Sequence, residues 1–157
     1  MLKYVDTLVS FQEVPDEISL CINISNCPNH CKGCHSQYLL EDIGKPLTDE
    51  TLQTLIKQNT GISCVCFMGG DKESWEVVRL AKLIREDFPE IKTAWYSGSE
   101  SVDHQNQFNY VKTGPYIESL GPLNSKTTNQ RMLEYNLSTD LGPSWYMRDI
   151  TYKFWKD

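Results

Sequence analysis

Three cysteines close together in the chain are the residues best suited to carry chemistry. Cys27, Cys31 and Cys34 follow the spacing C-x3-C-x2-C. Three thiolates this near one another can hold a single metal centre without help from a distant part of the chain. The sequence therefore predicts a metal site formed by these three side chains.

A zinc ion and an iron–sulfur cluster are the two centres that such a triplet can hold. Zinc ligands are usually arranged as two pairs separated by a spacer, and the sequence offers no matching second pair. An iron–sulfur cubane usually takes four thiolates, so three would leave one iron open to a substrate or cofactor. The candidates for a fourth zinc ligand are His30, His35, Cys64 and Cys66.

The pattern of apolar residues predicts the strands and helices that position the other motifs. Apolar residues at every second position predict one strand, continuous apolar runs predict buried strands, and apolar residues at helical spacing predict helices. This alternation of strand and helix is typical of βαβ units with a parallel sheet. The expected strands are 18–25, 62–68, 91–96 and 108–111, and the expected helices are 48–57 and 72–88.

The last third of the chain has a different pattern. Strands are expected over 131–137 and 149–155, with the turn signal Leu141-Gly142-Pro143 between them, so we expect a hairpin added to the sheet.

Trp75 and Trp95 are expected in the core. Cys64-Val65-Cys66 lies in an apolar strand, and its two thiols are expected to be buried and structural.

Three motifs directly follow expected strands. They are the cysteine triplet, Gly69-Gly70-Asp71 and Ser97-Gly98. In parallel α/β folds the loops at the carboxyl ends of strands converge on one ligand site. We therefore expect the three motifs to face one pocket.

Composition and charge exclude several classes of partner. The 157 residues include 15 Lys and Arg against 21 Asp and Glu, a net charge of −6. A nucleic-acid-binding face needs clustered basic residues, so no nucleic acid partner is expected. Without an apolar run of about 18–20 residues or the features of a signal peptide, we expect a cytoplasmic chain with no membrane partner. We expect one domain over residues 1–157.

The segment CPNHCKGC resembles the signature of the radical S-adenosylmethionine (radical SAM) enzymes. Gly69-Gly70-Asp71 resembles the Gly-Gly-Glu motif with which that family holds the methionine amino group, and Asp71 keeps the carboxylate with a shorter reach. The backbone of Gly33, Cys34 and His35 resembles the stretch that contacts the cofactor adenine. Ser97 is expected either to hydrogen-bond the cofactor or to act only as a turn residue.

Three further segments narrow the resemblance. WYSG at 95–98, KTGPYI at 112–117 and NSKTTNQR at 124–131 are similar to the activating enzymes of anaerobic ribonucleoside-triphosphate reductases. The similarity runs from about residue 18 to 131. Members of that family commonly have Val-Asp or a similar pair before Gly-Pro, where this chain has Lys112-Thr113. The departure argues against a specific role for a carboxylate at this position.

The resemblance implies a [4Fe–4S] cluster held by Cys27, Cys31 and Cys34, with S-adenosylmethionine at its fourth iron. An oxidoreductase of this kind cleaves S-adenosylmethionine to a 5′-deoxyadenosyl radical. That radical makes a glycyl radical on the large subunit of the reductase, its protein substrate. The electron would come from a flavodoxin- or ferredoxin-like donor, and no catalytic residue beyond the cluster is expected because the cofactors carry the hard step.

The implied fold is a single-domain α/β protein, an incomplete (partial TIM-type) parallel β/α barrel of the radical SAM type with a C-terminal β hairpin. A full barrel needs about 200 residues or more, so one side is expected to be uncovered and open to a glycine loop. Two alternatives remain. The chain activates another glycyl-radical enzyme or acts on a small molecule, or it is a zinc-binding interaction module without catalysis.

Overall fold

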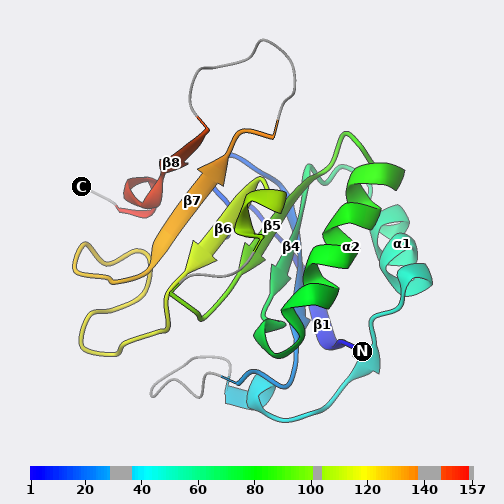
Figure 1. The fold of residues 1–157 in the computed structure, drawn as a ribbon, viewed down its shortest axis with the longest axis horizontal. Coiled ribbons are helices and arrows are strands. Elements are labelled where there is room, and N and C mark those ends of the chain that lie inside the picture. The colour runs from blue at the N-terminus through cyan, green and yellow to red at the C-terminus, as the bar shows by residue number, and fades with distance from the viewer. Residues whose placement is uncertain (29–36, 101–103, 138–145, 156–157) are drawn as a thin grey trace.

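The computed structural model describes residues 1–28, 37–100, 104–137 and 146–155. Within these residues the chain forms one eight-stranded sheet and two α-helices (Figure 1). The strands are β1 (Lys3–Ser10), β2 (Ser19–Ile24), β3 (Lys45–Pro46), β4 (Cys64–Met68), β5 (Lys92–Tyr96), β6 (Tyr110–Thr113), β7 (Arg131–Tyr135) and β8 (Met147–Asp149). The helices are α1 (Asp49–Gln58) and α2 (Ser74–Asp87), with short 3-10 turns η1 (Gln37–Leu40), η2 (Asp71–Glu73), η3 (Gln105–Gln107) and η4 (Thr151–Phe154).

The strand order is β3-β1-β2-β4-β5-β6-β7-β8. The four central strands β2, β4, β5 and β6 run parallel, as the alternating pattern predicts. The outer strands pair antiparallel, so the sheet is mixed, and it is open at β3 and β8. The relation of this sheet to a partial barrel stays a prediction.

Both α-helices bury their apolar stripes against one face of the sheet. Leu52 and Ile56 of α1 and Leu80 and Ile84 of α2 pack in one cluster with β-strand residues such as Phe67. Helix α1 begins after Thr48, whose side-chain Oγ1 accepts a hydrogen bond from the Thr51 N–H at 3.1 Å. Helix α2 begins at Ser74, later than the predicted 72, because η2 comes first. No helix in the described ranges is long and apolar enough to cross a membrane.

The second face of the sheet is covered by loops. Cys21, Cys64 and Cys66 alternate with the helix-facing residues and lie on this face, where Val14, Leu123 and Ile150 bury them. The uncovered side expected of a partial barrel stays a prediction, since it concerns the gap left by missing strands and not this face of the sheet. Segments before β2, before β7 and after β8 each contribute an apolar residue to this cover. The expectation that Cys64 and Cys66 are buried is confirmed.

The C-terminal strands form a hairpin as expected, but its second strand lies earlier in the chain than the predicted 149–155. Strands β7 and β8 pair antiparallel, but β8 ends at Asp149 and residues 151–154 form η4. The Asp149 carboxylate explains this end because it accepts hydrogen bonds from both the backbone N–H and the hydroxyl of Thr151, at 2.9 and 2.6 Å. Thr151 Oγ1 in turn accepts from the Met132 N–H at 2.8 Å, which fixes the turn to β7.

The two tryptophans expected in the core differ in their positions. Trp95 is fully buried and packs on Phe108 with ring centroids 5.3 Å apart. Trp75 is 64% exposed, so its assignment to the core is wrong. It lies in the first turn of α2, and Val77 and Val78 are the residues of this end of the helix that pack in the core.

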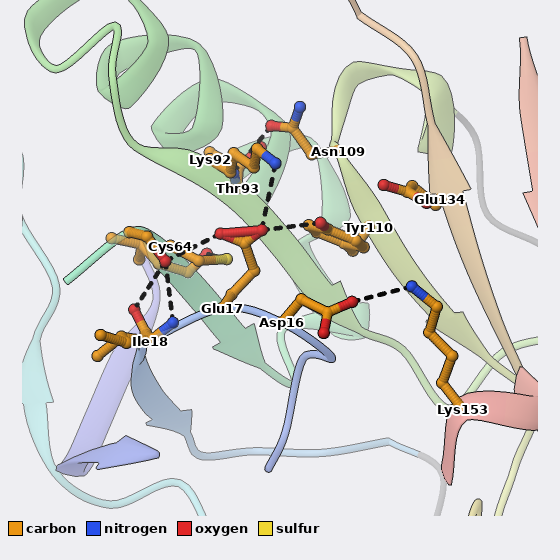
Figure 2. A network of polar contacts seen from close by, with 12 residues as sticks. Asp16, Glu17, Ile18, Cys64, Lys92, Thr93, Asn109, Tyr110, Glu134 and Lys153 are labelled. Atoms are coloured by element: carbon orange, nitrogen blue, oxygen red, sulfur yellow. Dashed lines mark hydrogen bonds and ion pairs between the residues drawn. The ribbon is translucent and has the colours of Figure 1, made fainter. Parts of the chain in front are cut away.

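A buried carboxylate joins the segment before β2 to the amino ends of the neighbouring strands (Figure 2). Glu17 accepts hydrogen bonds from Ser63 Oγ at 2.9 Å, Lys92 Nζ at 3.2 Å and the Tyr110 hydroxyl at 2.9 Å. Ser63 immediately precedes β4, whereas Lys92 and Tyr110 are the first residues of β5 and β6. Burial, and then the Glu17 carboxylate, raise the pKa of Tyr110 above its ordinary value. This network ties the amino ends of three parallel strands together.

Candidate metal and cofactor site

A cavity of about 190 Å³ lies at the other end of the sheet, where the four parallel strands reach their carboxyl ends. The arrowheads of β4, β5 and β6 point to this end in Figure 1. The predicted residues Cys27, Gly69 and Asp71 line it together with Gly98. The described parts of the three motifs thus meet at one cavity. Its other lining residues are Asn23, Ile24, Leu39, Leu40, Met68, Tyr96, Lys112, Tyr116 and Gln130.

Cys27 reaches the cavity from the end of β2. The segment 39–41 holds the backbone around it, because the Cys27 N–H donates to the Leu39 carbonyl at 2.9 Å and the Asn26 N–H donates to the Glu41 carbonyl at 3.0 Å. Asn26 takes a left-handed φ of 62°, which turns the chain out of the strand. The cysteine side chain is half-buried at the wall. Two of the predicted cluster ligands, Cys31 and Cys34, lie outside the described residues. The same holds for the predicted cofactor contacts Gly33, Cys34 and His35.

The remaining cysteines belong to the covered face of the sheet. Burial raises the pKa of both Cys64 and Cys66 above the ordinary thiol value, which favours the neutral thiol over the metal-binding thiolate. Neither residue lines the cavity of Cys27. In the part of the chain that the structure describes, no group of three or more Cys, His, Asp or Glu side chains could hold a metal ion.

The Gly69-Gly70 turn needs glycine at both positions. Gly69 has a φ of 113° and Gly70 a φ of 95°, in a region that side chains rarely adopt. A Cβ on Gly70 would also lie 2.5 Å from Cγ2 of Val77 in α2. The Gly69 carbonyl accepts a hydrogen bond from the buried Trp95 indole at 2.7 Å, so strand β5 fixes the turn that follows β4.

Asp71 is held by the motif that follows β5. Its Oδ1 accepts a hydrogen bond from Ser97 Oγ at 2.5 Å, and its Oδ2 accepts from the Gly98 N–H at 2.8 Å. Ser97 is fully buried, and its Oγ also accepts from the Ser99 N–H at 3.0 Å. The predicted cofactor residue Ser97 therefore orients the predicted cofactor residue Asp71. Gly70 is likewise buried and directly precedes η2, whose first residue is Asp71.

Several lining residues were not assigned to the site from the sequence, and three of them are Tyr96, Lys112 and Gln130. Tyr96 ends β5, Lys112 lies near the end of β6, and Gln130 lies in the loop before β7. Their positions at the carboxyl ends of parallel strands are the signal that could have found Tyr96 and Lys112. Gln130 donates to the Gly114 carbonyl at 3.4 Å, and Lys112 Nζ donates to the same oxygen at 3.0 Å.

The donors present fit an iron–sulfur cluster as far as they are described. Cys27 supplies a half-buried thiol at the wall of a cavity that has no other cysteine in its described lining. Two further thiols, those of Cys31 and Cys34, follow within seven residues along the chain. Thiolates are the usual ligands of such clusters.

Comparison with known families gives one match. A sequence model described as a 4Fe-4S single cluster domain matches residues 18–132. This range spans the cysteine triplet and, among the described residues, the four parallel strands and the whole lining of the cavity. No curated protein and no solved structure matches the chain.

Proposed function

The chain belongs to the family of 4Fe-4S single cluster domains, and on that basis we propose that it is a radical S-adenosylmethionine activating enzyme. Its protein substrate would be the large subunit of an anaerobic ribonucleoside-triphosphate reductase, on which it generates a glycyl radical. The family supports the iron–sulfur part of this proposal. The segments at 95–98, 112–117 and 124–131 support the choice of substrate through their resemblance to such activating enzymes.

One observation carries the proposal. Cys27, at the start of the cysteine triplet, shares a cavity with the Gly69 backbone and the Asp71 carboxylate. These groups come from the ends of different strands, and parallel sheets place ligand sites at that position. A purely structural metal site would not need a cavity with an oriented carboxylate beside its ligands.

The residues of the chain would divide the work as follows. Cys27, Cys31 and Cys34 would hold the cluster, which when bound supplies the electron for reductive cleavage of S-adenosylmethionine. Asp71 would accept hydrogen bonds from the methionine ammonium of that cofactor. Ser97 fixes the Asp71 carboxylate from behind. The apolar lining residues would keep water from the site.

The partner would approach the open end of this cavity, because loops cover the middle of the second sheet face.

We further propose that the four parallel strands form the partial barrel implied by the resemblance. A flavodoxin- or ferredoxin-like protein would act as the electron donor.

Anaerobic iron and sulfide analysis with an optical spectrum is the first test. Reconstituted wild type should hold about four irons and four sulfides per chain. The triple variant Cys27→Ala, Cys31→Ala, Cys34→Ala should hold none. With dithionite, wild type should convert S-adenosylmethionine to 5′-deoxyadenosine, and with the reductase large subunit it should produce the electron paramagnetic resonance signal of a glycyl radical.

The matched control is Cys66→Ala, which removes a buried thiol of the covered face and should leave the iron content unchanged. Zinc without iron after anaerobic reconstitution would instead identify an interaction module. Formation of 5′-deoxyadenosine without a glycyl radical on the reductase would point to another glycyl-radical enzyme or to a small-molecule substrate.

A further inference from the structure

One edge of the sheet carries a strand that is paired along only part of its outer side. Strand β1 has eight residues, but β3 pairs only with Lys3 and Tyr4 at its start. From Asp6 to Ser10 the described residues place no strand on the outer side of β1. A strand paired on one side directs alternate backbone N–H and C=O groups outward, where another extended chain can pair with them.

The remaining edge positions carry features that oppose such pairing. Strand β3 presents an exposed lysine, Lys45, and a proline, Pro46, which has no backbone N–H to donate. Strand β8 is only three residues long, and two of them, Arg148 and Asp149, are charged and exposed. Residues 7–10 of β1 include neither a charged residue nor a proline. Along the described edges of the sheet, this stretch of β1 is therefore the one left open to pairing.

Apolar side chains are exposed on both faces of this stretch. Leu8 lies opposite Cys21 and therefore on the face that loops cover. Val9 lies opposite Leu20 and therefore on the face that the helices cover. Leu8 is 60% exposed and Val9 is 39% exposed, and Phe11, directly after the strand, is 70% exposed. A strand added here would bury apolar surface on both faces while it pairs with the outward backbone groups.

The charge pattern of this edge suits a second copy of the chain. When two β1 strands pair antiparallel about Leu8 or Val9, their uncharged residues 7–10 face one another. The two Asp6 carboxylates then lie at opposite ends of the pair, so no like charges meet. Each Asp6 also accepts a hydrogen bond from its own Asn23 Nδ2 at 2.7 Å. The chain itself thus supplies the uncharged, extended partner that this edge requires.

We propose that β1 forms a homodimer interface, at which two copies pair their β1 strands antiparallel and join their sheets into one. Leu8 and Val9 pair with the first half of β2, whereas the cavity of Cys27 lies at the carboxyl ends of the parallel strands. Each copy therefore keeps its own cavity open. The inference goes beyond the proposed function and does not rest on it.

Sedimentation equilibrium over a series of protein concentrations tests the dimer, on anaerobically purified protein with a thiol reductant. Wild type should associate reversibly to a dimer. Leu8→Lys and Val9→Lys each add a charge on one face of the edge and should lower the association constant about tenfold or more. Both positions are exposed, so both variants should fold like wild type, which circular dichroism checks. Met147→Lys adds the same charge at the exposed β8 edge and should leave the association constant unchanged.

Hydrogen exchange then locates the interface. In wild type the amides of residues 6–10 should exchange more slowly at high protein concentration than at low concentration, whereas those of β8 should not change. In Leu8→Lys this dependence on concentration should disappear over the same range.

A wild type that stays monomeric across the series would overturn the inference. So would a dimer whose association constant is the same in both lysine variants, or one that leaves the exchange of residues 6–10 unchanged. Iron content and 5′-deoxyadenosine formation are separate measurements, so failure of the dimer and failure of the proposed function are distinguishable.

Discussion

Gly70 combines a left-handed backbone with a close neighbour. A side chain there would need to tolerate a φ of 95° and would place its Cβ 2.5 Å from Val77 Cγ2. Gly61 provides a matched control, because its φ of 90° is similar but no atom lies within 4 Å of its Cβ position. The pair separates the cost of the backbone conformation from the cost of the clash.

We therefore expect Gly70→Ala to lower the free energy of unfolding by more than Gly61→Ala does. Both changes carry the left-handed penalty of about 1–2 kcal/mol, and Gly70→Ala adds about 1–3 kcal/mol for overpacking. Chemical denaturation measures both. Equal losses would show that α2 shifts to accommodate the extra methyl group.

Ser97 acts through Asp71. The change Ser97→Ala removes the donor to Asp71 Oδ1 and the acceptor of the Ser99 N–H, both in a buried place. A hydrogen bond to a charged group contributes about 1.5–3 kcal/mol, so we expect a loss of stability of that size.

Ser119→Ala, at an exposed position, is the control for Ser97→Ala and should change stability by less than about 0.5 kcal/mol. Denaturation midpoints give both values. If Ser97→Ala is as stable as this control, the hydrogen bond to Asp71 does not contribute to the fold.

At the scale of elements, periodicity predicted the parallel part of the sheet because its strands are buried on both faces. Strand β1 was not predicted, since its Leu8 is 60% exposed and its pattern lacks fully buried positions.

The site was predictable where a motif carried it, as at Cys27 and Asp71. Lys112 belongs to no motif, so only its position at the carboxyl end of β6, which pairs in parallel with β5, could have pointed to the cavity.

The Glu17 network is the element-scale feature opposite the cavity. Glu17→Gln places an amide where Ser63, Lys92 and Tyr110 all donate hydrogen bonds to a carboxylate. We expect a loss of about 1–3 kcal/mol in the free energy of unfolding, because the new NH2 group faces donors in a buried site.

Glu90→Gln is the matched change at an exposed carboxylate and should be nearly neutral. Hydrogen exchange of β2 amides would report whether the strand loosens along with the segment before it. If Glu17→Gln is as stable as wild type, the hydrogen bonds to Glu17 stabilise the fold no more than hydrogen bonds to water stabilise the unfolded chain.

At the scale of the whole molecule, several buried acids share one pKa direction. Burial raises the pKa of Cys64 and Cys66 above the ordinary 9.0 and that of Tyr96 and Tyr110 above the ordinary 10.0. The folded state therefore keeps protons that the unfolded state releases in alkali. The stabilising contribution is fully present below pH 9 and is lost as the pH rises from there.

We expect the free energy of unfolding to fall above pH 9, by up to about 1.4 kcal/mol per pH unit for each group that has passed its unfolded pKa. Urea denaturation between pH 7 and pH 11 with a thiol reductant measures the slope. Tyr110→Phe should make the slope above pH 10 shallower. A stability that stays constant across this range would contradict the burial of these protons.

The cavity has no local origin in the chain. Its walls come from the end of β2, the loops after β4 and β5, strand β6 and finally Gln130 before β7. Parallel strands need long crossover connections, so the walls of the cavity meet only when segments far apart in the chain have come together. On the ribosome the cysteine triplet emerges well before Gln130 does. A nascent chain thus carries the thiols first and gains the last described wall of their enclosure only after Gln130 has been made.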